Sequence, residues 1–172
     1  MVNEMNEKAF IEYSPRLYDI GRELFEQYQQ QLIAEDVVAS GALKNGKWNI
    51  EQDDKHLALV FNLQDYWKTI EYGRKPTKEA KDGTVWRKIK QWILVKGIQF
   101  KPKQLQNGEQ RQPTLDEMAH AITKSIHKKG YKAKHPLEKA LNNNQSLINE
   151  FVDLSAKIYT DISAEINDLY RL

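Results

Sequence analysis

The sequence contains no cysteine, which excludes disulfide bonds and thiolate-bound zinc as supports for the fold. It has no apolar run near the ~20 residues that a membrane-spanning helix needs. The N-terminal segment carries Glu4, Glu7 and Glu12 in place of the basic start and apolar core of a secretory signal. We therefore expect a protein that is made in the cytoplasm and stays off the membrane.

The sequence also lacks the residue constellations on which most enzymes depend. It has no glycine-rich phosphate loop, no nucleophile elbow and no carboxylate pair in an apolar setting. His120 and His127 stand seven residues apart on a predicted helix, or about 10.5 Å along its axis, which is too far to share a metal ion. We therefore expect no enzyme activity, no cofactor and no metal site.

What is present fits one globular domain with an uneven charge distribution. A chain of 172 residues with 40% hydrophobic and 29% charged residues can bury a sizeable core. Residues 68–139 hold 18 Lys and Arg against 7 Asp and Glu, whereas the remainder holds 8 against 17. Such a basic segment suits nucleic acid or an acidic partner, and it is also the composition of a solvated helix surface.

The first strong signal along the chain is a helix start at Ser14 and Pro15. An apolar stripe with spacings of three and four residues follows and predicts a helix to about Ala34. Residues before Ser14 predict a short separate helical piece. The stripe consists of Leu17, Ile20, Leu24, Tyr28 and Leu32.

A β-hairpin is the next expected element. Residues 47–51 and 56–63 each alternate between apolar and polar side chains, and the acidic pair at 53–54 joins them. A lone hairpin is marginally stable in water, so it needs a covering element. Residues 66–72 are placed to supply one, as a helix or as a third strand.

Two further helices are predicted on either side of a long loop. Residues 84–96 form the first, with Gly97 at its C-terminus, and residues 100–112 show no periodicity and predict a loop. Thr114 and Glu117 have the spacing of a capping box and open the second helix, which Gly130 ends. The inner face of the first helix is expected to hold Val85, Ile89, Trp92 and Ile93.

A last helix is expected to be weakened at residues 142–144 and to carry a long apolar stripe. That stripe suits packing against a neighbouring subunit or along the helix's own domain. Among the four tryptophans, Trp67 and Trp92 are expected in the core, while Trp48 and Trp86 suit either core or interface. The stripe consists of Leu147, Phe151, Leu154, Ile158, Ile162, Ile166 and Leu169.

These elements together predict an α+β fold. A small antiparallel β-sheet is packed by a long N-terminal helix and further helices, and a long C-terminal helix follows. We expect a single domain over residues 1–172, with residues 142–172 as a helical C-terminal extension.

The order of short motifs resembles the neck and tail-completion proteins of tailed bacteriophages. The resemblance covers roughly residues 38–141: a Ser-Gly-x-Leu turn before two strands, an aromatic segment ending in Glu-Tyr-Gly-Arg-Lys-Pro, a helix with Trp-Ile, and a closing segment at 135–137. The residues that carry the signature are Ser40, Gly41, Leu43, Tyr66, Trp67, Glu71, Tyr72, Gly73 and Trp92.

The resemblance implies a structural virion protein that forms a homo-oligomeric ring at the head–tail junction. Such a ring joins portal or adaptor proteins to the tail and lines the passage for DNA ejection. It also implies partner contacts, or non-specific contacts with DNA phosphates. The candidate contact residues are Arg74, Lys75, Lys78, Lys101 and Lys103.

Two other functions remain open at this point. A small cytoplasmic DNA-binding regulator would use the basic segment 68–139, although a regulator is expected to join its two helices by a short turn, and residues 96–113 form a long connection. A small enzyme would need a deep pocket with perturbed titratable groups.

Overall fold

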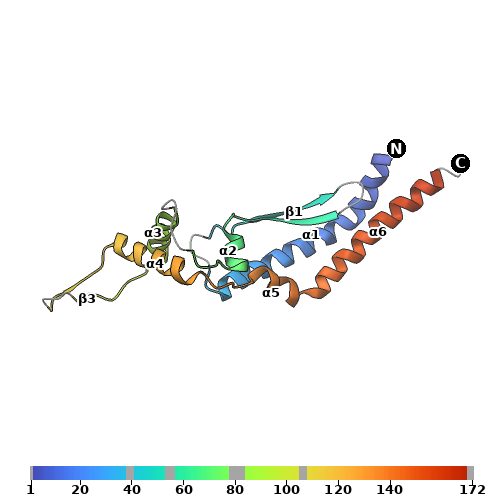
Figure 1. Ribbon diagram of the computed structural model, residues 1–172. Coiled ribbons are helices and arrows are strands. Elements are labelled where there is room, and N and C mark those ends of the chain that lie inside the picture. Colours follow the sequence, from blue (N-terminus) through green and yellow to red (C-terminus); the bar gives the residue numbers. More distant parts are fainter. Residues whose placement is uncertain (1, 38–40, 53–56, 78–83, 105–107, 170–172) are drawn as a thin grey trace.

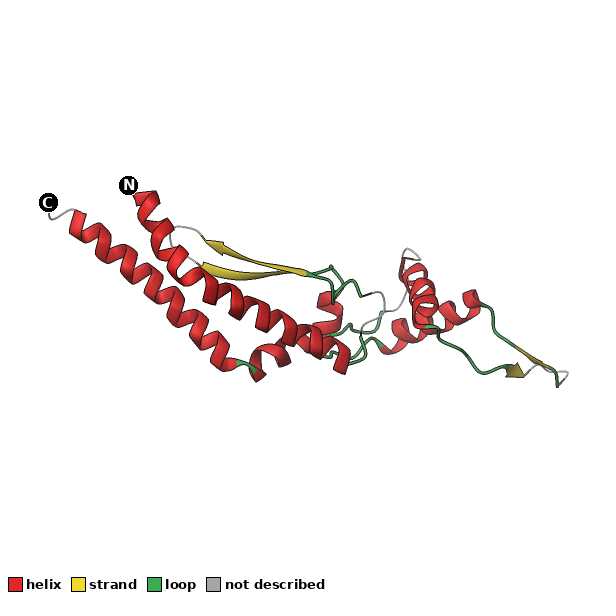
Figure 2. Ribbon diagram, turned by 180° about the vertical axis from the view of Figure 1, so that it is seen from behind, coloured by secondary structure: helices red, strands yellow, loops and turns green. Residues whose placement is uncertain are grey.

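The computed structural model describes residues 2–37, 41–52, 57–77, 84–104 and 108–169. The molecule is elongated, with a body at one end that holds both termini and an arm at the other end (Figures 1 and 2). The body consists of α1, the β1–β2 hairpin, α2, α5 and α6. The arm consists of residues 84–129, which follow α2 in the chain and return to α5.

Helix α1 spans Val2–Ala34 and is the longest element of the body. Its end at Ala34 confirms the prediction, but the expected start at Ser14 is wrong, because the helix runs through Pro15. Proline removes one backbone hydrogen bond inside a helix, so another contact must offset that loss. One such contact lies just before the proline, where the Tyr13 hydroxyl donates to Asp161 of α6 at 3.0 Å. The predicted separate piece is therefore part of α1.

The expected hairpin is present and lies on α1. Strand β1, Lys47–Gln52, pairs antiparallel with β2, Leu57–Asn62, and the predicted turn at residues 53–54 lies outside the described residues. Trp48 and Leu59 face α1 so closely that a Cβ on Gly21 would lie 2.5 Å from the Trp48 ring. Glycine at this position of α1 therefore allows the hairpin to pack against the helix.

Three shorter elements close the body: α2, Trp67–Tyr72; α5, Pro136–Asn143; and α6, Gln145–Leu169. The covering element at residues 66–72 is thus a helix, and the predicted break at 142–144 is the boundary between α5 and α6. The main core lies between α1, the hairpin and α5, with Trp67 packed against it. Its buried members are Phe25, Tyr28, Leu32, Leu43 and Ala140.

Helix α6 lies along α1, so its apolar stripe packs within the chain as far as the structure describes it. Ile158 is fully buried against Leu17. Arg16 of α1 makes a two-pronged ion pair with Glu150 of α6, with both N···O distances at 2.6 Å. The side chains of the stripe from Ile162 onward lie outside the description.

The arm contains α3, Thr84–Lys96, and α4, Leu115–Lys129, packed against each other. Thr114 and Glu117 form the predicted capping box, and Gly97 follows α3 with φ at +61°. The expected loop at 100–112 is corrected, because β3, Lys103–Gln104, pairs with β4, Gln110–Arg111. A ladder this short leaves no alternating pattern for the sequence to reveal.

The waist, residues 73–77 and 130–134, joins arm and body. Arg74 and Tyr131 exchange two backbone hydrogen bonds of 2.8 Å, and the Thr77 N–H donates to the His127 carbonyl at 2.8 Å. Gly130 has φ at +77°, and a Cβ there would collide with the Arg74 carbonyl oxygen. Glycine is therefore required where the two strands of the waist meet.

The architecture is α+β, as expected, with six helices and two two-stranded antiparallel sheets in the described residues. In the body, α1 packs against the β1–β2 hairpin, and in the arm the β3–β4 ribbon projects beyond α3 and α4 (Figure 2). None of the described helices has the length and apolarity that crossing a bilayer requires.

Candidate functional site

The arm is the most strongly charged part of the molecule. Residues 84–129 hold 10 Lys and Arg against 3 Asp and Glu. Two of the three acidic residues form ion pairs with basic residues of the arm itself: Lys90 lies 2.5 Å from Asp116, and Arg111 lies 2.6 Å from Glu117. The arm therefore presents a surplus of positive charge to the solvent.

The inner side of α3 holds the arm together. Ile93 is 2% exposed, and Trp86 stacks on His120 of α4 with ring centroids 5.2 Å apart. The Lys90 ammonium lies 5.2 Å from the Trp86 ring centroid, which adds a cation–π contact to its ion pair. This packing fixes which side of α3 is turned outward.

The outward side of α3, called here the α3 face, combines cations with large apolar side chains. Trp92 is 36% exposed, Leu94 64% and Val95 49%. The prediction that Trp92 belongs to the core is wrong, because it lies one position, about 100° around the helix, from the buried Ile93. The α3 face consists of Arg87, Lys88, Gln91, Trp92, Leu94 and Val95.

The predicted contact residues do not form one patch. Arg74 and Lys75 lie in the waist, where the Arg74 guanidinium donates to Thr77 at 3.4 Å. Lys103 is exposed in β3, and Lys101 is exposed just before it, at the far end of the arm (Figure 1). Lys78 lies outside the described residues. Sequence reasoning missed the α3 face, although exposed residues at 87–88, 91–92 and 94–95 recur at helical spacing.

The signature residues of the resemblance serve mainly to build the body. Leu43 is 3% exposed, and Gly41 adopts φ of +76° in the turn before it, while Ser40 lies outside the described residues. Tyr66 and Tyr72 are 38% and 67% exposed. Gly73 allows α2 to pass into the waist, since a Cβ there would lie 2.6 Å from the Tyr131 carbonyl oxygen.

Glu71 is the one buried carboxylate among the described residues, and it is 3% exposed. Its two oxygens accept the backbone N–H groups of Leu137 and Glu138, each at 2.9 Å. These N–H groups belong to the first turn of α5, where the helix has no internal acceptor for them. His135 precedes the helix with φ of +55° and offers no capping side chain of its own. Glu71 from α2 therefore caps α5.

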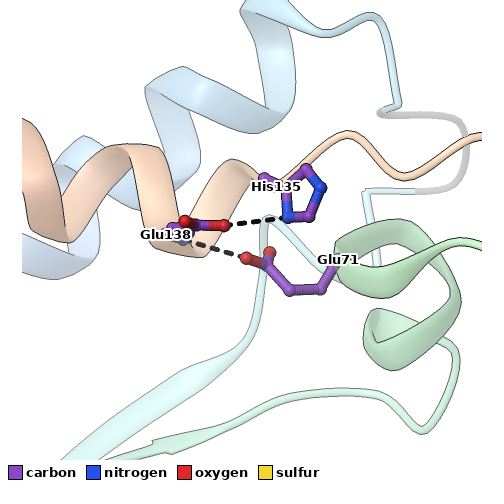
Figure 3. A group of neighbouring side chains, drawn as sticks. All are labelled: Glu71, His135 and Glu138. Atoms are coloured by element: carbon purple, nitrogen blue, oxygen red, sulfur yellow. Dashed lines mark hydrogen bonds and ion pairs between the residues drawn. The ribbon is translucent and has the colours of Figure 1, made fainter.

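Glu71, His135 and Glu138 also form the one metal-like cluster in the described part of the chain (Figure 3). Their ligand atoms lie within 4.8 Å of one another, and His135 Nδ1 lies 2.9 Å from Glu138 Oε2. The positive end of helix α5 favours the Glu71 carboxylate itself over a metal ion at this position, because both Glu71 oxygens already accept N–H groups there. We therefore interpret the cluster as a helix cap.

A pocket of about 300 Å³ lined by His135 opens beside this cap. Glu35 lies at its edge, where Lys134 donates to it at 3.2 Å and Lys139 forms a second ion pair. These hydrogen bonds, that from Lys139 first, lower the pKa of Glu35 below its ordinary value. Ligand pockets are typically apolar with a few converging polar groups. Three of the residues that line this pocket, Glu35, Lys134 and Lys139, are instead paired with one another.

One pair of side chains has the form of a nucleophile beside a base. Thr77 Oγ1 lies 2.5 Å from His127 Nδ1 at the waist. A catalytic pair needs a third group that orients the base, but His127 Nε2 is buried without a hydrogen-bond partner among the residues that the structure describes. The pair therefore works as a brace between the waist and α4.

Comparison with known proteins finds no counterpart for the chain: no family model, no curated protein and no solved structure matches it. The features that bear on function are therefore the charged arm, the α3 face and the motif order.

Proposed function

We propose that this protein is a structural virion protein of the neck or tail-completion type. In this role, copies form a ring at the phage head–tail junction, join the portal or adaptor to the tail and surround the DNA passage. The observation that carries the proposal is the projecting arm, which presents large apolar side chains together with exposed cations that have no ion pair within the described part of the chain. Trp92 is 36% exposed and Leu94 is 64% exposed, so both present apolar surface to the solvent.

A ring subunit needs a rigid body and a surface for its neighbours, and both parts are available here. The body is braced by α1, α6 and the hairpin, and the arm is held to it by the two backbone hydrogen bonds between Arg74 and Tyr131. Large exposed apolar side chains are costly for a monomer in water and are typical of interaction sites. The motif order that resembles the phage proteins runs through both parts.

The alternative function, a DNA-binding regulator, is supported by the positive charge of the arm. A helix-turn-helix reader joins its two helices by three or four residues and presents polar side chains to base edges. In the arm, residues 97–114 separate α3 from α4, and the outward residues of α3 after Gln91 are Trp92, Leu94 and Val95. This composition favours a protein partner.

Deletion of the coding sequence from the phage that carries it tests the proposal. We expect the mutant to accumulate DNA-filled heads and separate tails, because the subunit that joins them is missing. Addition of purified protein to the mutant extract should restore joined, infectious particles. Normal particle assembly combined with altered transcription of phage genes would refute the structural role and favour the regulator.

A further inference from the structure

A second surface, on α1 of the body, complements the α3 face. Tyr18 is 48% exposed, and Arg22 and Glu26 follow it at four-residue spacing on the solvent side of the helix. Arg22 is neutralised by Asp19 at 2.7 Å, whereas Glu26 has no ion pair among the described residues. This α1 stripe, Tyr18, Arg22 and Glu26, therefore offers one aromatic ring and one available negative charge.

The α3 face has the opposite arrangement of charge. Arg87 and Lys88 at one end are exposed and have no ion pair among the described residues, and the apolar Val95 lies at the other end. Lys88 and Val95 are seven residues apart, which is about 10.5 Å on a helix. Tyr18 and Glu26 are eight residues apart, which is about 12 Å. The cation-to-apolar spacing of α3 thus matches the anion-to-aromatic spacing of α1.

The whole molecule repeats this complementarity. The segment 68–139, which contains the arm, has 18 Lys and Arg against 7 Asp and Glu, and the rest of the chain has 8 against 17. Figure 1 shows the arm at one end of the elongated molecule and the N-terminal end of α1 with the C-terminal end of α6 at the other. Opposite charges on separate parts of one chain favour contact between the arm of one copy and the body of another.

We propose that the α3 face of one copy docks on the α1 stripe of a second copy, with Arg87 and Lys88 near Glu26 and Val95 near Tyr18. This inference rests on the proposed ring role and specifies its contact. The two surfaces are different, so the contact is heterologous, and its repetition closes into a ring when the rotation between copies permits. Because each copy offers both surfaces, every copy in the ring makes the same pair of contacts.

The absence of cysteine allows a direct test with single-cysteine variants. Gln91→Cys lies at the centre of the α3 face, and Arg22→Cys lies at the centre of the α1 stripe. Each variant is purified with a tag of different mass, and the two are mixed under mild oxidation at concentrations up to about 1 mM, where weak contacts are populated. A disulfide-linked product of mixed mass is expected. Neither variant alone should form a disulfide-linked dimer.

The control pairs Gln91→Cys with Lys157→Cys, an exposed position on α6 outside the α1 stripe. This pair should form no disulfide-linked product, because the docked contact does not bring the two cysteines together. Charge reversal provides a second readout: Glu26→Lys should reduce the mixed product about tenfold, and Arg87→Glu together with Lys88→Glu should restore it.

Three results would overturn the docking inference: no mixed product at any concentration, equal cross-linking of the control pair, or a dimer of Gln91→Cys alone. Salt-sensitive binding of the arm to random duplex DNA without a mixed product would assign the α3 face to DNA instead. The same protein is also sought by mass spectrometry in purified phage particles. Its presence there without the cross-link refutes the docking alone, and its absence refutes the virion role.

Discussion

Removal of the Glu71 carboxylate tests the strongest structural assignment in the body. The two hydrogen bonds from the α5 backbone to Glu71, at 2.9 Å each, are charge-assisted and buried. Such bonds contribute about 1.5–3 kcal/mol each. Glu71→Gln keeps one acceptor oxygen but turns an NH₂ group toward the second N–H donor, so we expect a loss of about 2 kcal/mol. Glu71→Ala removes both acceptors and should cost about 4 kcal/mol, a large part of the 5–15 kcal/mol that stabilises a typical domain.

Urea unfolding followed by circular dichroism measures both variants against the wild type. The midpoint should fall while the slope with denaturant stays constant. Glu138→Gln is the matched control, because its side chain is 59% exposed and only its backbone contacts Glu71. We expect the control to lose less than about 1 kcal/mol.

The same experiment separates a helix cap from a metal site. If the cluster held a metal ion, Glu71→Gln and Glu138→Gln would cost similar amounts, and a chelator would lower the stability of the wild type. The cap assignment predicts unequal costs and no effect of the chelator. Equal losses in the two variants, or a loss below about 0.5 kcal/mol for Glu71→Gln, would refute the reasoning.

Three further predictions concern the waist, the arm and the α3 face. Gly130→Ala should lower the free energy of unfolding in urea by about 3 kcal/mol, because the backbone is strained there and the new Cβ collides with Arg74. The control Gly97→Ala has open space around it and should cost about 1 kcal/mol. Similar costs for the two variants would contradict the assigned role of the waist. Hydrogen bonds from Arg111 and then Thr114 lower the pKa of Glu117 from 4.5 to about 2. The contribution of Glu117 to the stability of the folded state is therefore present above pH 4.5 and is lost as the pH falls toward 2. A carboxyl titration by NMR that centres on 4.5 would disprove this pairing. Leu94→Ala should change the free energy of unfolding by less than about 1 kcal/mol, because Leu94 is 64% exposed, yet it should weaken the mixed cross-link. A large loss of stability with intact cross-linking would contradict the placement of Leu94 on the α3 face.

The elements with strong local signals could be predicted from the sequence. The capping box at Thr114 and Glu117, the glycine after α3 and the alternation in the hairpin are properties of neighbouring residues, and each appears in the structure. The predicted start of α1 is wrong, and its cause is also a local signal. Ser14 and Pro15 form a helix-start signal, but contacts such as that between Tyr13 and Asp161, 148 residues apart, favour a continuous helix.

The candidate sites depended on contacts that no local pattern encodes. Glu71 caps a helix that begins 65 residues later, and the sequence alone does not bring these segments together. Trp92 was assigned to the core because periodicity alone does not distinguish adjacent positions at the edge of an apolar stripe. Exposure of the α3 face follows from how α3 meets α4, through Ile93 and Trp86, which is a tertiary property.

The most direct test of the central claim is antibody–gold labelling of phage particles purified from a culture that expresses this chain, viewed by electron microscopy. The proposed ring role predicts gold at the head–tail junction of intact particles. Intact particles without label, together with no peptide of this chain by mass spectrometry, would contradict the account.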